Sequence, residues 1–372
     1  MTTHTARALA LAIAARVPTI VWGSPGTGKT SAVVDMATAS GFPCEVVIAS
    51  IREPSDFAGL PVVGPSGIVN FAPPSWAQRL ADAGRGVLFL DEISTAPPAV
   101  QAALLRVVLE RAVGDLQLPD EVVVVGAANP PEQAADGWDL AAPLANRFCH
   151  LDWSVDARTW SDGIVGGFSK NVIPTLDQGE LEKAAFRHRA RVGGFLVSRS
   201  ALLSVVPSDA ATAGRAWPSP RSWTMAARLS AAGEMMGAPR DLIVDLVSGC
   251  VGPAASLEYL AWTDDAGLPD PEAVLADPQS FVLPERGDRA YAALSSIVAA
   301  VRSDNTAERW SAAWTAIAAG VRDGQADLAV AVMRPLIEHR PEGAMPPPEA
   351  LAFVAPVLRE AGLFEALVAP HA

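Results

Sequence analysis

The sequence predicts an α/β protein, with a three-layer αβα domain over residues 1–152 and helices after it. Strand-like and helix-like segments alternate along residues 1–152, which is the pattern of a parallel sheet covered by helices on both faces. A glycine-rich loop at residues 23–30 joins one such strand to a helix. From about residue 153 the strand pattern stops, and the helical spacing of apolar residues takes its place.

The composition is that of a folded protein with more than one domain. Of the 372 residues, 50% are hydrophobic and 19% are charged, and the length exceeds that of one ordinary domain. The formal net charge is −13 without any run of five Lys or Arg, which argues against a nucleic-acid-binding protein. The three cysteines (Cys44, Cys149 and Cys250) lack C-x-x-C spacing, so we expect reduced thiols and a cytoplasmic protein. No apolar run is long enough to span a bilayer, so we expect no membrane insertion.

The first predicted elements surround the glycine-rich loop. Residues 8–15 have the composition of a secretion signal, but they run almost directly into the strand at 17–22, so we interpret them as a helix beside it. The loop fits G-x-x-x-x-G-K-[ST] at every required position, with the residues Gly23, Ser24, Pro25, Gly26, Thr27, Gly28, Lys29 and Thr30. Its N–H groups and the N-terminus of the following helix are expected to bind phosphate oxygens. We expect Lys29 to reach the β- and γ-phosphates and Thr30 to ligate Mg²⁺.

Further strands and helices complete the predicted α/β domain. The remaining core strands are expected at residues 44–50, 87–92, 122–129 and 149–152. Helices are expected at residues 30–37, 75–84 and 96–110, the last opened by proline residues. Two short hairpins are expected at residues 60–71 and 111–118, each around a glycine-containing turn.

Two carboxylates, Asp91 and Glu92, stand at the C-terminal end of the strand 87–92. On its own the pair is also consistent with a solvated strand end. About sixty residues after a phosphate-binding loop, however, these residue types suit Mg²⁺ binding and phosphate hydrolysis. We expect Asp91 to hold Mg²⁺ with Thr30, and Glu92 to polarise the water that attacks the γ-phosphate.

Three more polar residues are candidates for the same chemistry. Asn129 ends a strand that we expect between the strands carrying the loop and Asp91, where its amide would bridge the γ-phosphate and the attacking water. Arg147 precedes the last strand, and Arg221 lies at the start of a helix. A guanidinium suits phosphate because its charge is permanent and its donors form a fork. Alone, Asn129 is also consistent with a turn residue, and each arginine with a solvated or salt-bridged side chain.

Together these motifs resemble the AAA+ ATPases, a group of P-loop NTPases, and most closely their MoxR-like, helix-2-insert branch. Besides the loop, the resemblance rests on Leu90-Asp91-Glu92-Ile93, Ala96-Pro97-Pro98, Gln101-Ala102-Ala103-Leu104-Leu105 and Glu110-Arg111. It covers residues 17–152 and extends weakly to about residue 250. It departs at Ser94-Thr95, where the MoxR-like pattern has Asn-Arg.

The resemblance implies a role for each of the later polar residues. Asn129 is implied to be the first sensor, and Arg147 an arginine finger that acts on the nucleotide of a neighbouring subunit. Arg221 is implied to be the second sensor, on a helical lid. The hairpin at 60–71 is similar to the helix-2 insert, and in such rings both hairpins tend to face the central pore.

The chain is therefore expected to form three domains. These are an AAA+ α/β nucleotide-binding domain at 1–152, an α-helical lid at 153–265 and an α-helical C-terminal extension at 266–372. Beyond residue 153, helices are expected at 179–191, 195–206, 221–236, 239–250, 289–302, 305–322, 325–338 and 347–367. Residues 263–288 are rich in Pro, Asp and Gly and are expected to be irregular.

The expected function is Mg²⁺-dependent ATP hydrolysis at the subunit interfaces of a hexameric ring that remodels, assembles or matures a protein client. The resemblance makes a von Willebrand A-domain protein the expected partner. One alternative is a nucleic-acid-associated motor, against which the charge of −13 argues. Another is a nucleotide-gated scaffold with negligible hydrolysis, against which the presence of Glu92, Asn129 and Arg147 argues.

Overall fold

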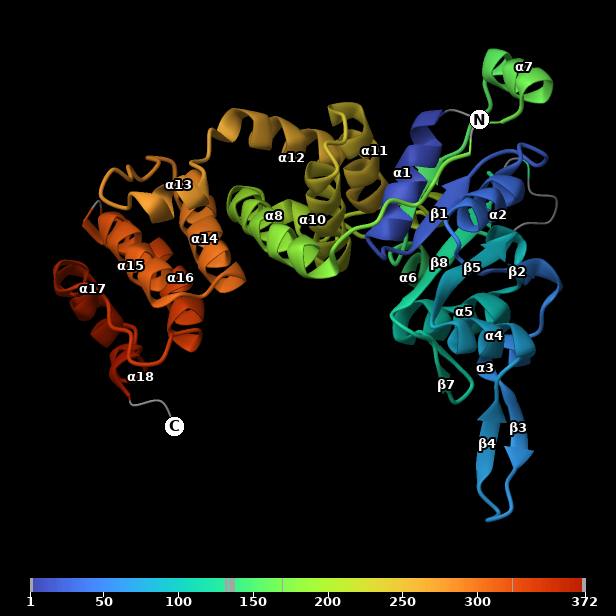
Figure 1. Ribbon diagram of the computed structural model, residues 1–372, viewed down its shortest axis with the longest axis horizontal. Coiled ribbons are helices and arrows are strands. Elements are labelled where there is room, and N and C mark those ends of the chain that lie inside the picture. The colour runs from blue at the N-terminus through green and yellow to red at the C-terminus, as the bar shows by residue number, and fades with distance from the viewer. Residues whose placement is uncertain (1–2, 131–132, 134–137, 169, 323, 370–372) are drawn as a thin grey trace. The chain divides into compact units, whose positions relative to one another are not determined.

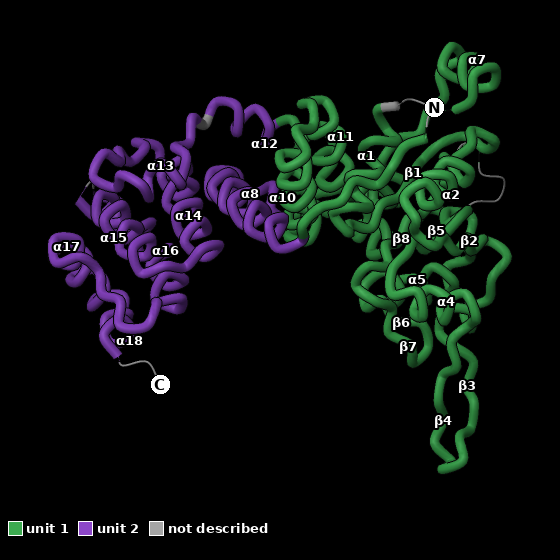
Figure 2. Tube along the Cα trace, in the orientation of Figure 1, with its two compact units in different colours: residues 1–177, 204–257 green, residues 178–203, 258–372 purple. Residues whose placement is uncertain are grey.

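The computed structural model describes residues 3–130, 133, 138–168, 170–322 and 324–369 (Figure 1). The chain forms two compact units, residues 1–177 with 204–257 and residues 178–203 with 258–372 (Figure 2). Each unit has its own apolar core. These units are defined by which residues pack together, and they differ from the three domains expected from the sequence. The boundaries of those three domains stay a prediction.

A five-stranded parallel sheet lies at the centre of the first unit, in the order β2-β5-β8-β1-β9. Its strands are β1 (Thr19–Trp22), β2 (Cys44–Ile48), β5 (Arg85–Asp91), β8 (Glu121–Ala128) and β9 (Cys149–Asp152). The prediction that Asn129 follows a strand between those of the loop and of Asp91 is confirmed, because β8 pairs with β5 on one side and β1 on the other. The carboxyl ends of these three strands therefore meet at one edge of the sheet.

Helices cover the sheet, as the predicted αβα core requires. Helices α1 (Thr3–Ala14), α2 (Lys29–Ala39) and α4 (Ser75–Ala83) contact its strands. This part of the chain also contains α3 (Ser55–Ala58), α5 (Pro98–Glu110) and α6 (Ala142–Ala145), with the 3₁₀ turns η1 (Ala49–Ile51) and η2 (Ile93–Thr95). The interpretation of residues 8–15 as a helix beside the first strand is confirmed, because α1 contacts β1 and its apolar residues are buried. The first unit also contains α7 (Ala157–Gly166), α9 (Ala210–Ala213), α10 (Pro220–Met235) and α11 (Arg240–Val251). Helix α11 packs against β9, the edge strand of the sheet.

Both predicted hairpins are present. The first consists of β3 (Leu60–Val63) and β4 (Val69–Ala72), and the second of β6 (Ala112–Val113) and β7 (Leu116–Gln117). The turn of the second hairpin meets the base of the first, because the Asp115 carboxylate accepts a hydrogen bond from the Phe71 N–H at 2.7 Å. Gly114 has a φ of +59°, and a Cβ at this position would overlap the Phe71 carbonyl.

The second unit is helical. It contains α8 (Gln178–Ser198), η4 (Ser200–Leu202), α13 (Pro271–Ala276), α14 (Gly287–Ser303), α15 (Ala307–Arg322), α16 (Ala326–Glu338), α17 (Pro348–Glu360) and α18 (Phe364–Val368). Helix α12 (Pro253–Ala266) crosses the boundary between the units. Helices α8 and α14 pack closely, since a Cβ at Gly194 would overlap Ala292. The buried rings of Trp310 and Trp314 meet edge to face in the core, with centroids 5.5 Å apart.

Three expectations about the helical part are wrong. Residues 195–206 do not form a separate helix, because α8 continues to Ser198 and a single 3₁₀ turn follows. Residues 263–288 include the end of α12 and all of α13, which Asp270 caps by accepting the Glu272 N–H. Residues 347–367 form two helices, because Gly362 adopts a φ of +68° between them. Within the described residues, no strand follows β9 and no helix has the length and apolar character needed to cross a membrane.

Candidate active site

The glycine-rich loop joins β1 to α2 through two glycines with positive φ. Gly26 has a φ of +74° and Gly28 one of +82°, a region that residues with a Cβ rarely adopt. Helix α2 then begins at Lys29. At the start of the loop, a Cβ on Gly23 would lie 2.5 Å from the Trp153 carbonyl oxygen, so only glycine fits there. The backbone conformation or the packing of the loop therefore favours glycine at Gly23, Gly26 and Gly28.

The Lys29 ammonium lies inside the loop. It donates hydrogen bonds to the Gly23 carbonyl at 2.6 Å, to the Ser24 carbonyl at 3.0 Å and to the Asn129 side-chain oxygen at 3.0 Å. Burial lowers the pKa of Lys29, and the two carboxylates at the end of β5 oppose this by favouring the charged form. The structure therefore brings Lys29 and Asn129 into direct contact across two neighbouring strands.

Thr30 and Asp91 form the second contact of the site. The Thr30 hydroxyl donates to the Asp91 carboxylate at 2.6 Å, and the other Asp91 oxygen accepts the Glu92 N–H at 2.9 Å. A hydroxyl and a carboxylate at the N-terminus of α2 are hard oxygen donors that fit Mg²⁺, which takes one or two protein ligands together with phosphate oxygens. The described residues contain no cluster of three or more His, Cys, Asp or Glu that would hold a metal elsewhere.

Glu92 has an unusual backbone conformation. Its φ of 55° and ψ of 38° lie in the left-handed region, which costs a non-glycine residue roughly 1–2 kcal/mol. Its carboxylate accepts a hydrogen bond from the Ser50 hydroxyl at 2.5 Å. Ser50 follows β2, the strand beside β5, so the sheet places these side chains together. The strained backbone turns Glu92 away from the line of β5 and toward Ser50.

Asn129 is held in place by Ser94. The buried Ser94 hydroxyl accepts the Asn129 N–H at 3.3 Å and lies 3.4 Å from the Asn129 carbonyl oxygen. The serine that departs from the MoxR-like Asn-Arg pattern thus positions the backbone of the predicted sensor. Sequence reasoning missed this role, because it depends on the pairing of β5 with β8.

Arg147 and Arg221 lie apart from this group of contacts. The Arg147 guanidinium donates to the Pro143 carbonyl, and within the described residues neither arginine forms a hydrogen bond with the loop at 23–30. Burial lowers the pKa of Arg147, and the positive charge of Arg221 lowers it further. The structure therefore brings the two arginines near each other.

The residue before Arg147 fixes the start of the helix that carries Arg221. The buried Asn146 amide donates to the Trp217 carbonyl at 3.0 Å, and its oxygen accepts the Ser219 hydroxyl at 2.6 Å. Ser219 also caps α10 by accepting the backbone N–H three residues later. Arg221 is the second residue of this capped helix. The relative position of the two arginines is thus set by buried hydrogen bonds.

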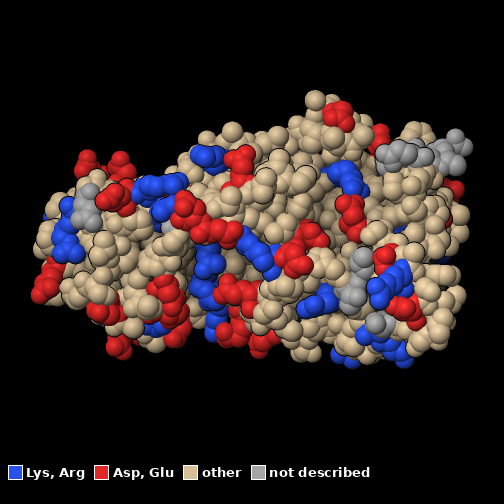
Figure 3. Space-filling model, turned by 90° about the horizontal axis from the view of Figure 1, so that it is seen from above, with Lys and Arg blue, Asp and Glu red and all other residues tan. Residues whose placement is uncertain are grey.

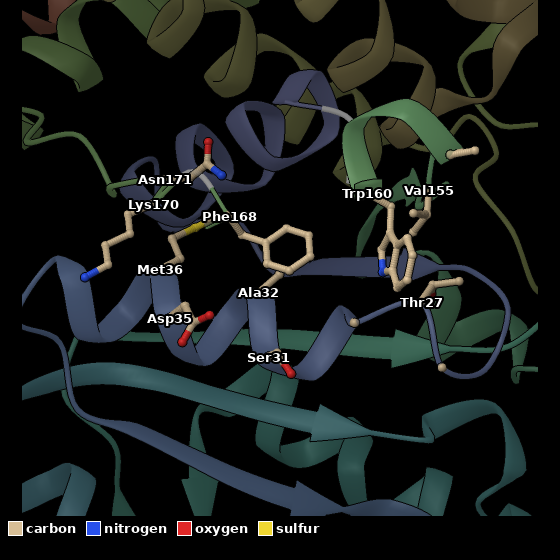
Figure 4. Close-up of a pocket in the computed structure, with 13 residues that line it drawn as sticks. Thr27, Ser31, Ala32, Asp35, Met36, Val155, Trp160, Phe168, Lys170 and Asn171 are labelled. Carbon is tan, nitrogen blue, oxygen red and sulfur yellow. The ribbon is translucent and has the colours of Figure 1, made fainter. Parts of the chain in front are cut away.

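A cavity of about 770 Å³ adjoins the loop, between α2 and α7 (Figure 4). Trp160, Val155 and Thr27 lie at one end, and the Phe168 ring lies above Ala32 on α2. Trp160 is 50% exposed, because its indole faces this open space. Trp160 therefore lines an open cavity.

Behind the loop, a buried histidine is held by two hydrogen bonds. The Trp22 indole donates to His150 Nδ1 at 2.9 Å, so the ring proton is on Nε2, which donates to the Ala145 carbonyl at 2.9 Å. Burial lowers the pKa of His150 to about 4; the Ala145 carbonyl opposes this, and the positive charge of Arg215 adds to it. His150 is therefore neutral in the folded protein at neutral pH.

The sequence of this part of the chain also matches a known family. Residues 19–148 match the family model described as "ATPase family associated with various cellular activities (AAA)". These residues contain the loop, Asp91, Asn129 and Arg147. They form an AAA ATPase domain. The match supports nucleotide binding in general, and it does not reach α10, where Arg221 lies.

Comparisons with curated proteins and with solved structures were also made. None of the curated proteins matches the sequence. The chain is similar to a protein of Cytophaga hutchinsonii described as a "putative ATPase", with 16% identity, a TM-score of 0.43, and coverage of 66% of this chain and 79% of that one. It is also similar to a full-length MCM homolog from Methanopyrus kandleri, with 16% identity, a TM-score of 0.36 and coverage of 70% of this chain. The chain spans 54% of the length of that MCM homolog.

Proposed function

We propose that the AAA domain hydrolyses ATP with Mg²⁺ and that its sites are completed between the subunits of a ring, as in MoxR-like proteins. The observation that carries this proposal is that the polar candidate residues form two separate groups, one at the loop and one around Arg147. At the loop, Lys29 contacts Asn129 and Thr30 contacts Asp91. Arg147 instead lies near Arg221, and in the described structure it makes no hydrogen bond with that loop. An arginine that makes no hydrogen bond with its own loop in the described structure is suited to contact the nucleotide bound at a neighbour's loop.

Within one subunit, the residues at the loop would have different roles in binding and hydrolysing ATP. Lys29 would exchange its three present acceptors for oxygens of the β- and γ-phosphates, which the N–H groups of the loop would also bind. Thr30 and Asp91 would hold Mg²⁺, which supplies charge neutralisation on the phosphates when bound. Glu92 would accept a hydrogen bond from the attacking water, and Asn129 would orient that water.

The base of the nucleotide would occupy the cavity between α2 and α7. A volume of about 770 Å³ is in the range of small-molecule sites, and its walls combine the Trp160 indole with apolar groups of α2. An aromatic ring contributes to the binding of a base by stacking. We therefore assign Trp160 to base binding.

Arg147 and Arg221 would act together on a neighbour's nucleotide. Two guanidinium groups held close to each other repel, and an anion placed between them removes the repulsion. A phosphoryl group of a second subunit is such an anion. This arrangement needs a head-to-tail interface, and such an interface forms a ring when the rotation between neighbouring subunits closes. A hexamer remains the expected ring size.

A protein client is favoured over a nucleic acid by the first hairpin. Both of its strands expose apolar side chains, namely Leu60, Val62, Val63, Val69 and Phe71. Residues 60–72 contain no Lys or Arg with which to contact phosphates. On the face drawn in Figure 3, Lys and Arg are interspersed with Asp and Glu. We propose that the hairpin contacts apolar segments of a client, of which a von Willebrand A-domain protein is the first candidate.

A cytoplasmic location, favoured by three free cysteines, belongs to the same proposal.

The test of ATP hydrolysis is Glu92→Gln, which keeps the size of the side chain and removes its basicity. ATP binding should persist while turnover falls by about 100-fold or more, since a placed general base contributes 10²–10⁴ in rate. Glu110→Gln, an exposed change on α5, is the control and should keep the wild-type rate. Equal turnover in Glu92→Gln and the control would remove Glu92 from its role.

A further inference from the structure

The second unit contains a small cavity that the nucleotide chemistry does not use. It measures about 230 Å³ and lies between α8, α14 and α16. Its walls include the side chains of Phe186, Arg189, Tyr291, Ser295 and Arg302. Among the described residues no Asp or Glu lines it, although the chain as a whole carries a formal charge of −13.

Two positive charges share one aromatic ring in this cavity. The guanidinium carbons of Arg189 and Arg302 lie 4.8 and 4.4 Å from the centroid of the Phe186 ring. Arg189 also forms an ion pair with Glu182 at 2.6 Å. For Arg302, the described part of the chain offers neither a hydrogen-bond acceptor nor a carboxylate. One guanidinium of the pair therefore lacks a counter-charge.

The stacking of Arg302 does not satisfy its hydrogen-bonding groups. A guanidinium stacks through its face, and its five N–H donors point outward in the plane of the group. Arg302 is in the last turn of α14, but it is not needed to cap that helix end. The Ala300 carbonyl already accepts hydrogen bonds from the Ser303 hydroxyl at 2.7 Å and from Arg309 at 3.0 Å. The donors of Arg302 thus remain available to a ligand.

Further donors beside Arg302 lack acceptors. The Ser295 hydroxyl and the Arg189 Nε atom are both buried, and in the described residues neither has a hydrogen-bond partner. A buried polar group without a partner is unfavourable, so a cavity that collects such groups is expected to gain from an acceptor. The Tyr291 hydroxyl adds a donor that has no partner in the described structure. The cavity therefore presents donors and positive charge but no fixed acceptor.

We infer that this cavity binds a small oxyanion, that is, a phosphate or carboxylate group of a small ligand. Arginine is suited to both groups because its planar fork matches two oxygens at once. The volume of about 230 Å³ is several times the roughly 30 Å³ that one water occupies in the liquid, so such a group fits. Gly193 of α8 also lines the cavity, where it faces the Tyr291 ring without a side chain of its own. This inference does not rest on ATP hydrolysis in the first unit.

The test is hydrogen–deuterium exchange of the full chain, titrated with inorganic phosphate or succinate at ionic strength matched with chloride. Exchange is read separately in peptides of α8 and α14 and in peptides of residues 23–30, so phosphate bound at the loop is not confused with this site. We expect saturable protection of the α8 and α14 peptides. The arm that protects at lower concentration identifies the class of oxyanion. No protection in either arm would overturn the inference.

The variants are Arg302→Gln and the matched control Arg322→Gln. Arg322 also lies in the last turn of a helix and stacks on a ring, with its guanidinium carbon 5.4 Å from the Phe353 centroid, but it is outside the cavity. We expect the control to match wild type and Arg302→Gln to bind at least about tenfold more weakly, since hydrogen bonds to charged groups contribute about 1.5–3 kcal/mol. Ser295→Ala removes one donor with little change in shape and should also weaken binding. Equal protection in wild type and both cavity variants would show an adventitious ion only.

Discussion

The Ser219 hydroxyl donates a hydrogen bond to the Asn146 side-chain oxygen at 2.6 Å, and both side chains are buried. This bond connects the turn that carries Arg147 to the capped end of α10, which carries Arg221. A single asparagine therefore links the two arginines that we assign to a neighbour's nucleotide.

Replacing Asn146 with Ala should separate these arginines without touching the loop. We expect ATP turnover to fall by about tenfold or more while nucleotide affinity stays close to wild type, because misplacing a catalytic group raises the barrier without weakening substrate binding. The free energy of unfolding should fall by about 1–3 kcal/mol, since the Trp217 carbonyl loses one of its two side-chain donors and the buried Ser219 hydroxyl loses its Asn146 acceptor. Steady-state kinetics and urea denaturation measure the two effects.

The control for Asn146 is Asn305→Ala in the second unit. The Asn305 amide also donates to a backbone carbonyl, that of His339 at 2.8 Å, but it is far along the chain from the site. This variant should keep the wild-type turnover. A loss of nucleotide affinity in Asn146→Ala, with turnover of the bound nucleotide unchanged, would argue against the role of this link.

Replacing Trp160 with Ala tests the assignment of the base to the cavity beside α2. The dissociation constant for ADP should rise by about tenfold or more, since stacking on an aromatic side chain contributes roughly 1–3 kcal/mol per base. Trp138→Ala is the matched control, because Trp138 is 54% exposed compared with 50% for Trp160 and does not line this cavity. Calorimetric titration measures both. Equal affinities in the two variants would exclude Trp160 from the base site.

Lowering the pH should destabilise the first unit through His150. The pKa of His150 is about 4 in the folded protein and near 6.5 when unfolded, so between these values the unfolded chain binds the extra proton. Stability is therefore retained above pH 6.5 and lost as the pH falls toward 4, by up to about 1.4 kcal/mol per unit and about 3 kcal/mol in total. Arg215 and Asp152 act on His150 with opposite signs, since the positive charge of Arg215 lowers the pKa of His150 and the negative charge of Asp152 raises it.

His150→Gln isolates that contribution. A glutamine can accept from Trp22 and donate to Ala145 but does not titrate. We expect the variant to be less stable than wild type at pH 7 and to lose less stability between pH 6.5 and 4.5, as measured by urea denaturation. Parallel pH profiles for the two proteins would contradict the assignment of this slope to His150.

The sequence alone predicted the parts of the site that local pattern determines. The loop has a fixed spacing of glycines, and the buried strands before Asp91 and Asn129 are continuous apolar runs whose ends are easily placed. In a parallel sheet the carboxyl ends of neighbouring strands share an edge, so the contact of Lys29 with Asn129 follows from strand order. The AAA match to residues 19–148 agrees with that part of the prediction.

What the sequence did not show depends on packing between distant segments. The contacts of Ser50 with Glu92 and of Ser94 with Asn129 depend on how the strands pair in the sheet, which the sequence does not state. The assignment of α8 to the second unit follows from its close packing on α14 through Gly194, a contact that spans about a hundred residues and leaves no local signal. Helix α13 was missed because proline and aspartate near its start also suit a loop.

The central claim is that Arg147 completes the site of a neighbouring subunit, and mixing two inactive variants tests it most directly. Lys29→Ala should lose nucleotide binding but still present Arg147, whereas Arg147→Ala should bind nucleotide but lack the finger. If the site is shared, each variant alone is inactive, and an equal mixture regains about a quarter of the wild-type rate per subunit, since that share of head-to-tail interfaces pairs an intact loop with an intact finger. If Arg147 acts within its own chain, or not at all, mixing restores nothing or Arg147→Ala is active alone, and either result would contradict the account.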